Sequence, residues 1–165
     1  LEINLKIKII KGDGNCLYEC FVKSGKCPDQ KHLRNLVASE LDTFKEKYKI
    51  FISNCSFEER VIGIRNNAYG DHLEIQIISN IFGLHIIIYH NNSNTETHIT
   101  PKTEIQTLNY NNKIHLLYSG DHYNLIVPIE TELFENKNGA LKIPEDTSKD
   151  ELMATILQIE SILSN

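Results

Sequence analysis

Residues 11–21 most constrain how this chain can fold. Before them, residues 3–9 alternate between apolar and polar side chains, as in a half-buried strand, and the alternation stops at Gly12 and Gly14. Glycines beside an Asp and an Asn supply turn conformations that other residues avoid, and an apolar helical pattern resumes at Cys16. The sequence therefore predicts a strand, a tight turn and a helix that begins at Cys16.

A thiol in the first turn of a helix is well placed to act as a nucleophile. The backbone N–H groups of that turn are unpaired and carry partial positive charge, which favours the thiolate form of Cys16. The same N–H groups can stabilise the oxyanion that forms when a thiolate attacks a carbonyl. The simpler interpretation is that Cys16 is a small buried apolar residue. The nucleophile hypothesis therefore requires a base elsewhere in the chain.

Composition limits the classes of partner and compartment. The chain has 165 residues, 41% of them hydrophobic, and a net charge of -5, which is typical of one globular domain. Its 17 basic residues are outnumbered by 22 acidic ones and form no basic block, so we expect no nucleic-acid partner. We find neither a membrane-length apolar run nor a signal-peptide pattern, and we expect no membrane association. The four cysteines are expected to be reduced thiols in the cytoplasm.

The rest of the chain alternates between helical and strand patterns, which predicts an α/β (α+β) fold. Helices are predicted from Pro28 to about Lys49, from a capping box of Ser56 and Glu59 towards Tyr69, and from Leu73 to Gly83. Charged residues of the long helix are expected on a solvated face. Strands are predicted at Ile86–Tyr89, Ile114–Tyr118 and Tyr123–Val127, with a hairpin edge at Thr95–Thr100. Residues 84–89 are almost continuously apolar, as in a strand at the centre of a sheet.

Among the seven histidines, His122 has the surroundings of a catalytic base. It follows a Gly-Asp turn at the start of a predicted strand, where residues i and i+2 point to the same face. Asn124 can therefore accept a hydrogen bond from one ring nitrogen of His122 and leave the other nitrogen for a thiol. Asp121 would point the other way.

Three short motifs together resemble the ovarian tumour (OTU) family of papain-like cysteine deubiquitinases. They are Asp13-Gly14-Asn15-Cys16-Leu17-Tyr18, then Tyr69, Gly70 and Glu74 before an apolar helix, and His122-Tyr123-Asn124 after a strand. The resemblance covers roughly residues 7–128. It implies a papain-like OTU fold, in which helices flank a small central twisted β-sheet.

The resemblance also implies the roles of the site residues. Cys16 would be the nucleophile, His122 the general base and Asn124 the orienting residue. The backbone amides of Asp13, Gly14, Asn15 and Cys16 would form the oxyanion hole. The Asp13 side chain could share the orienting role or only cap the turn. Neither a cofactor nor a metal is implied.

One segment departs from the family's pattern. Members often carry Trp-Gly-Gly where this chain has Tyr69, Gly70 and Asp71, so a loop that faces the substrate could be reshaped. By family position these three residues and Glu74 are candidates for contact with the substrate, near a narrow channel for a Gly-Gly tail. Glu74 could equally be a structural partner.

The function implied is hydrolysis of isopeptide bonds at the C-terminal glycine of ubiquitin. Ubiquitin or polyubiquitin chains would be the partners of a monomeric enzyme, in the host cytosol if the source is a virus or an intracellular microbe. One alternative is a ubiquitin-binding module with little turnover. Another is a cysteine peptidase that acts on a ubiquitin-like protein or on a polyprotein.

Two further expectations concern a metal site and the C-terminal region. A zinc site built from Cys16, Cys20, Cys27 and His32 lacks the paired short spacings of structural zinc modules. We expect an OTU-like catalytic domain over residues 1–130 and an extension over residues 131–165. In the extension, Ser148 and Glu151 would cap a final helix that packs on the same domain. Its apolar stripe could instead be a ubiquitin-interacting motif.

Overall fold

The protein forms two compact units. A computed structural model describes residues 5–102 and 112–128. The larger unit comprises residues 9–125, and the smaller comprises residues 1–8 and 126–165. Every candidate catalytic residue belongs to the larger unit. The predicted extension over residues 131–165, its helix and the domain boundary at residue 130 lie outside the described residues and stay predictions.

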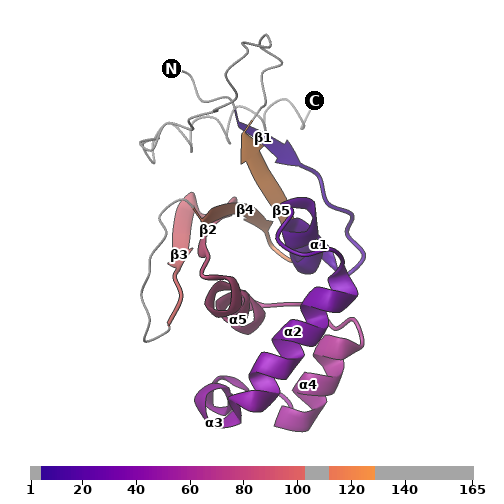
Figure 1. The fold of residues 1–165 in the computed structure, drawn as a ribbon. Helices are drawn as coiled ribbons and strands as arrows, with labels where there is room; N and C mark the ends of the chain where they lie inside the picture. Colours follow the sequence, from indigo (N-terminus) through magenta and orange to yellow (C-terminus); the bar gives the residue numbers. More distant parts are fainter. Residues whose placement is uncertain (1–4, 103–111, 129–165) are drawn as a thin grey trace. The chain divides into compact units, whose positions relative to one another are not determined.

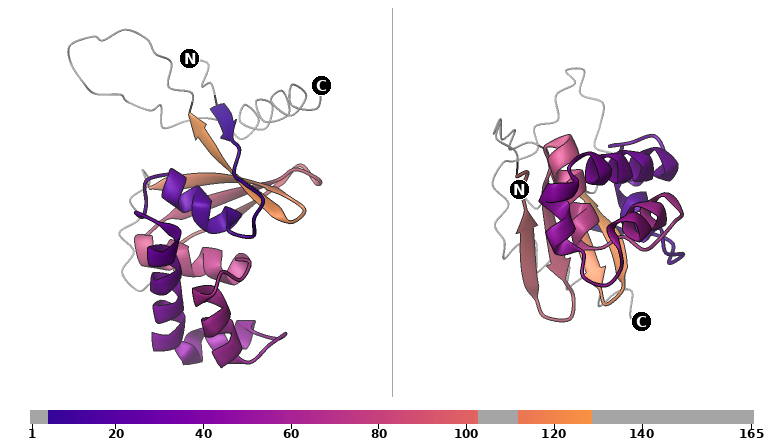
Figure 2. Two further views of the ribbon diagram at one scale, coloured as in Figure 1. Left: turned by 90° about the vertical axis from the view of Figure 1, so that its right-hand side faces the viewer. Right: turned by 90° about the horizontal axis from the view of Figure 1, so that it is seen from below.

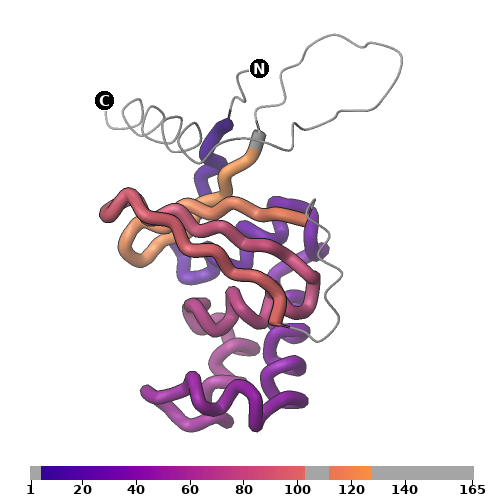
Figure 3. Tube along the Cα trace, turned by 90° about the vertical axis from the view of Figure 1, so that its left-hand side faces the viewer, coloured from indigo at the N-terminus to yellow at the C-terminus, as the bar shows by residue number. Residues whose placement is uncertain are grey.

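A mixed sheet of five strands forms the β part of the fold (Figure 1). The strands are β1 (Leu5–Lys8), β2 (His85–His90), β3 (Thr95–Ile99), β4 (Lys113–Ser119) and β5 (His122–Pro128). They hydrogen-bond in the order β1-β5-β4-β2-β3. Figure 3 shows β3, β2 and β4 side by side, and β2 runs antiparallel to β3 and parallel to β4. The α+β fold class and the three main predicted strands are confirmed.

Strand β2 is an interior strand, as its apolar run predicts. Ile86, Ile87, Ile88 and Tyr89 are all buried, and Ile86 lies opposite Ile99 on one side and Ile114 on the other. The middle strand of the five is β4. The predicted hairpin edge is β3, which lies at the end of the sheet.

The other regular elements of the larger unit are helices. They are α1 (Cys16–Lys23), α2 (Gln30–Thr43), α3 (Lys45–Tyr48), η1 (Lys49–Phe51, a 3-10 helix), α4 (Phe57–Arg65) and α5 (His72–Phe82). Figure 2 shows α2 packed beside α4 and α5. The capping box of Ser56 and Glu59 begins α4 as predicted, and Gly83 ends α5 with a left-handed φ of 64°. In the described part of the chain, none of these helices is both long and apolar enough to cross a bilayer.

The long helix predicted from Pro28 to Lys49 is wrong in one respect, because it breaks at Phe44. Phe44 leaves helical geometry with φ −109° and ψ 42°, and its side chain is 49% exposed. The sequence pattern had counted this side chain among the inward-facing ones. Beyond the break Tyr48 is buried, and its hydroxyl donates to Glu40 and accepts from Asn80. Beyond the break, Tyr48 is thus held by polar contacts to α2 and α5.

Two glycine substitutions should change stability with opposite signs. Gly83→Ala places a side chain in the left-handed region and should lower the free energy of unfolding by about 1 kcal/mol. Gly63→Ala lies inside α4, where a new Cβ would sit 3.4 Å from the Cβ of Ala68, and should raise it by about 0.5 to 1 kcal/mol. Urea denaturation of both variants measures the difference, and a shift of the same sign in both would contradict this assignment of the glycines.

Candidate functional site

The turn predicted before Cys16 is present and is held by Asp13. The Asp13 carboxylate accepts a hydrogen bond from the Asn15 N–H at 3.1 Å, and Gly14 has a φ of 83°, which favours glycine. Asn15 is the N-cap of α1 and Cys16 is its first residue. The hydrogen bond from the Asn15 N–H to the Asp13 carboxylate favours the turn-capping role for Asp13. Because the Asn15 N–H is already engaged, the predicted oxyanion donors reduce to the N–H groups of Asp13, Gly14 and Cys16.

His122 and Asn124 lie together at the start of β5, as the strand period predicts. The Asn124 Oδ1 lies 3.1 Å from the His122 Nε2, and it also accepts the backbone N–H of Ile10 at 2.9 Å. Since Oδ1 is only an acceptor, Nε2 must carry the proton, and Nδ1 of the neutral ring is free to accept one. A Cβ built on Gly12 would lie 3.7 Å from this Nδ1. The free nitrogen therefore lies against the turn that leads to Cys16.

Two tyrosines, Tyr69 and Tyr123, lie close enough to the candidate nucleophile to interact with it electrostatically. Cys16 is only 1% exposed in the free protein, so a substrate must move neighbouring side chains to reach the sulfur. Tyr69, which is 39% exposed, stacks on Tyr123 with ring centroids 6.4 Å apart. Burial and, after it, the neighbouring Cys16 sulfur raise the pKa of Tyr69 above its ordinary value. The rings of Tyr118 and Tyr123 also pack, with centroids 4.8 Å apart. The sequence did not single out Tyr118, which lies in the last part of β4, one residue before its end.

Gly70 is a point of close approach between the loop before α5 and helix α1. A Cβ at this position would lie 2.7 Å from Leu17 Cδ2 and 3.0 Å from Tyr18 Cε2. Both side chains are buried and belong to α1, the helix that carries Cys16. A glycine is therefore needed here for packing.

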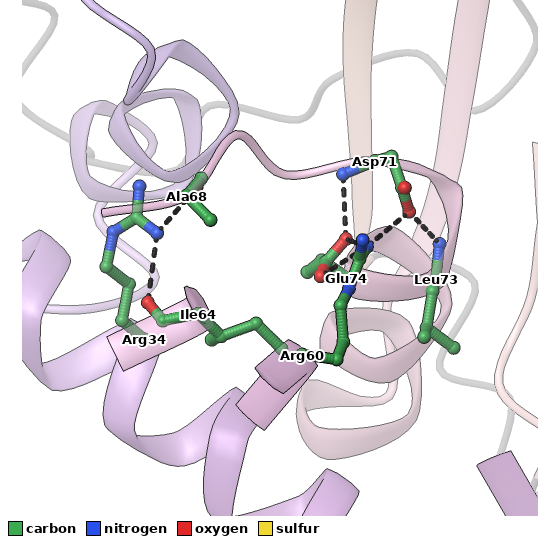
Figure 4. Close-up of polar contacts among 7 residues, drawn as sticks. All are labelled: Arg34, Arg60, Ile64, Ala68, Asp71, Leu73 and Glu74. Carbon is green, nitrogen blue, oxygen red and sulfur yellow. Dashed lines mark hydrogen bonds and ion pairs between the residues drawn. The ribbon is translucent and has the colours of Figure 1, made fainter. Parts of the chain in front are cut away.

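Glu74 and Asp71 hold the first turn of α5 (Figure 4). Glu74 is 1% exposed, accepts the Asp71 N–H at 2.7 Å and pairs with Arg60 at 2.7 Å. Asp71 accepts the Leu73 N–H and pairs with Arg60 at 2.9 Å. The burial of Glu74 favours its alternative role as a structural partner over contact with substrate. Asp71 and Glu74 form a second capping box, which the sequence signals by an Asp followed three residues later by a Glu.

Two of the cysteines considered for a zinc site lie in environments that favour the neutral thiol. The Cys20 thiol points at the Tyr123 carbonyl, 3.8 Å away, and burial raises its pKa well above the ordinary value. Burial likewise raises the pKa of Cys27 to about 11. Among the residues that the structure describes, no group of three or more His, Cys, Asp or Glu side chains is arranged to hold a metal ion.

A family profile described as OTU-like cysteine protease matches residues 11–125 of this chain. The match includes Asp13, Cys16, His122 and Asn124.

Two curated proteins are similar in sequence. An RNA replication protein of Citrus leprosis virus C is 28% identical over 162 residues, which cover 89% of this chain and 6% of that protein. An Arabidopsis thaliana protein named OVARIAN TUMOR DOMAIN-containing deubiquitinating enzyme 2 is 24% identical over 124 residues, which cover 72% of this chain and 56% of that protein. The chain thus spans only part of the length of either relative.

Solved structures share the fold. An OTU domain in complex with ubiquitin has a TM-score of 0.68 and 22% identity, and the match covers 96% of this chain and 86% of that one. The OTU domain protease of Taggert virus has a TM-score of 0.56 and 19% identity, with 80% and 86% covered. These likenesses confirm the expected papain-like OTU architecture.

The pH dependence of stability should reveal the buried carboxyl of Glu74. Burial raises its pKa from 4.5 to about 7, although Arg60 opposes the shift. Between these pH values the folded state holds a proton that the unfolded chain has released, so this group's contribution to stability falls as the pH rises. Relative to Glu74→Gln, the wild type should lose about 3 kcal/mol from about pH 4.5 to about pH 7.5.

The comparison with Glu74→Gln is needed because other groups titrate in the same range. The pKa values of His85 and His115 are lowered by burial, so their contributions change with the opposite sign. Both histidines are present in wild type and variant and cancel in the difference. Glu58→Gln, at an exposed carboxylate, is the matched control. The hydrogen bond with Lys45 lowers the pKa of Glu58, so this variant should leave the slope above about pH 5.5 unchanged. If the difference in the free energy of unfolding between wild type and Glu74→Gln does not change with pH, the burial of a titrating carboxyl is contradicted.

Proposed function

Because the chain belongs to the family of OTU-like cysteine proteases, we propose that it hydrolyses isopeptide bonds at the C-terminal glycine of ubiquitin. In this proposal Cys16 is the nucleophile, His122 the general base and Asn124 the residue that orients the imidazole. The observation that carries it is the double hydrogen bond at Asn124 Oδ1, which fixes the His122 tautomer. The ring nitrogen that is left free lies against the turn before Cys16.

The reaction proceeds in two steps. His122 accepts the proton of the Cys16 thiol, and the resulting thiolate attacks the carbonyl carbon of the isopeptide bond while the backbone N–H groups of Asp13, Gly14 and Cys16 stabilise the oxyanion. The carbon–nitrogen bond breaks as protonated His122 gives its proton to the departing lysine amine. Water then attacks the thioester, His122 accepts a proton from that water, and the free carboxylate leaves as the thiol is restored.

Support for ubiquitin as the substrate comes from the similar proteins and not from the shape of a pocket. The solved OTU domain was captured with ubiquitin, and the Arabidopsis relative is named as a deubiquitinating enzyme. A Gly-Gly tail is slender enough to pass beside Tyr69 and reach Cys16 once the covering side chains move. Affinity would come from a larger surface of ubiquitin beside this entrance. The four free cysteines are consistent with the cytosol as the working compartment.

A second candidate function is proteolysis of a longer viral protein. The match to the Citrus leprosis virus C protein covers only 6% of its length, so that relative is a long chain that contains a similar segment. Incubation with ubiquitin and peptide substrates in parallel separates the two: cleavage of the peptides without cleavage of ubiquitin conjugates supports the second candidate. Binding of ubiquitin without turnover would indicate the binding-module alternative.

Replacement of the nucleophile should abolish turnover without loss of the fold. Cys16→Ala should lower kcat on a ubiquitin C-terminal fluorogenic amide by at least about 10⁴-fold and prevent labelling by a ubiquitin-based electrophile. Cys55→Ala, at the exposed free cysteine, is the matched control and should retain both activities. Circular dichroism checks that each variant is folded. Labelling of Cys16→Ala at the wild-type rate would refute the assignment.

Removal of the Asn124 side chain should affect activity more than stability. Asn124→Ala leaves the His122 ring unoriented and should lower kcat by about 100-fold. It also removes the acceptor of the Ile10 N–H, which should lower the free energy of unfolding by about 1 kcal/mol. Asn124→Asp keeps an acceptor oxygen in place and should retain more activity. Wild-type kcat in Asn124→Ala would rule out the orienting role.

A further inference from the structure

Arg34 is a buried cation whose hydrogen-bond partners are all neutral. It lies in α2, is 1% exposed, and corrects the expectation that the charges of this helix face solvent. Its guanidinium donates to the carbonyls of Ile64 at 3.1 Å and Ala68 at 2.9 Å and to the Asn15 side chain at 2.6 Å. Within residues 5–102 and 112–128, no carboxylate forms an ion pair with it. Glu74 acts on Arg34 only through its charge and not through a direct contact, and burial still lowers the pKa of the guanidinium. A buried charge without a direct counter-ion is costly, which makes a purely stabilising role a poor explanation for Arg34.

The acceptors of Arg34 belong to the two segments that flank the candidate nucleophile. Asn15 immediately precedes Cys16, and its own N–H is held by Asp13. Ile64 lies in the last turn of α4, and Ala68 precedes the loop residues Tyr69 and Gly70. Figure 4 shows the guanidinium reaching across from α2 to both carbonyls.

Helix α1 packs into the same arrangement. The Arg34 guanidinium lies 3.8 Å from the centre of the Tyr18 ring. Tyr18 in turn contacts the point where Gly70 approaches α1. The stack and the hydrogen bonds together connect the start of α1 to the loop at Gly70 through one side chain.

We infer that Arg34 is a positioning residue, which fixes the Asn15 side chain and so sets the peptide that leads into Cys16 relative to the loop of residues 66–70. The inference rests on the proposed function, in which Cys16 must meet both the His122 imidazole and the substrate carbonyl. A displacement of about 1 Å at such a pair costs about 100-fold in rate. The planar fork of arginine serves the carbonyls with one nitrogen and Asn15 with the other, which a lysine ammonium cannot do.

The test is a double-mutant cycle between Arg34 and Asn15, measured as kcat and KM on a ubiquitin fluorogenic amide. Arg34→Gln should lower kcat by about 100-fold and change KM by less than about threefold. In an Asn15→Ala background, where the bond is already absent, Arg34→Gln should lower kcat by less than about threefold further. Arg34→Lys keeps the charge and loses the fork, and should still lower kcat by at least about tenfold.

Two controls separate positioning from stability. Leu41→Ala removes a fully buried side chain from the same helix, so it should lose at least as much stability as Arg34→Gln while keeping kcat of the folded protein within about threefold. Arg65→Gln removes an exposed arginine from α4 and should change neither quantity. If Arg34→Gln does not fold, the kcat values of Asn15→Ala and Arg34→Lys are compared with that of Leu41→Ala at matched melting temperature. This comparison then decides between a positioning role and a purely stabilising one.

A purely structural Arg34 would give additive losses in the cycle and a fall in kcat no larger than that of Leu41→Ala, and either result overturns the inference. Failure of the proposed function is distinguishable, because the wild type would then not cleave the ubiquitin substrate. In that case the same cycle is measured on the rate of Cys16 alkylation by iodoacetamide, in a Cys55→Ser background. Non-additive rates support the positioning role, and additive rates refute it.

Discussion

The amide oxygen of Asn124 accepts two hydrogen bonds, and the candidate site depends on both. One comes from the Ile10 backbone, just before the glycine turn, and the other comes from the His122 ring. A single acceptor thus joins the segment that leads to Cys16 and the strand that carries the imidazole, although these are far apart in the chain. Because the same oxygen sets which ring nitrogen keeps its proton, the fold of the segment and the chemistry of the ring are fixed together.

Buried polar groups position the remaining segments around this contact. Arg60 on α4 pairs with Asp71 and Glu74 at the start of α5, and Arg34 on α2 holds carbonyls near the end of α4. Apolar packing alone is non-directional and does not fix the exact positions of these helices. Hydrogen bonds to guanidinium groups have fixed directions, so they define where the loop at Tyr69 and Gly70 lies. The larger unit therefore combines an apolar sheet core with a polar framework around the loops.

Local patterns in the sequence predicted most of the elements and part of the site. The glycine turn, the start of α1 at Cys16, the capping box at Ser56 and the Gly83 stop each depend on neighbouring residues, and each is present in the structure. The pairing of His122 with Asn124 follows from the two-residue period of a strand. The sequence did not predict the break at Phe44. The Tyr48 hydroxyl beyond it bonds to Glu40 and Asn80, and Asn80 lies on α5, far along the chain.

The local geometry of the candidate site was therefore predictable from short motifs, since a strand period, a turn and a helix start each act over a few residues. The burial of Glu74, the packing of Tyr118 against Tyr123 and the contacts of Arg34 could not be predicted in this way, because they depend on tertiary structure. A glutamate, a tyrosine or an arginine has the same local pattern whether it faces water or a neighbouring helix. Long-range packing alone removes water from these groups and supplies their partners, and that sets what each of them does.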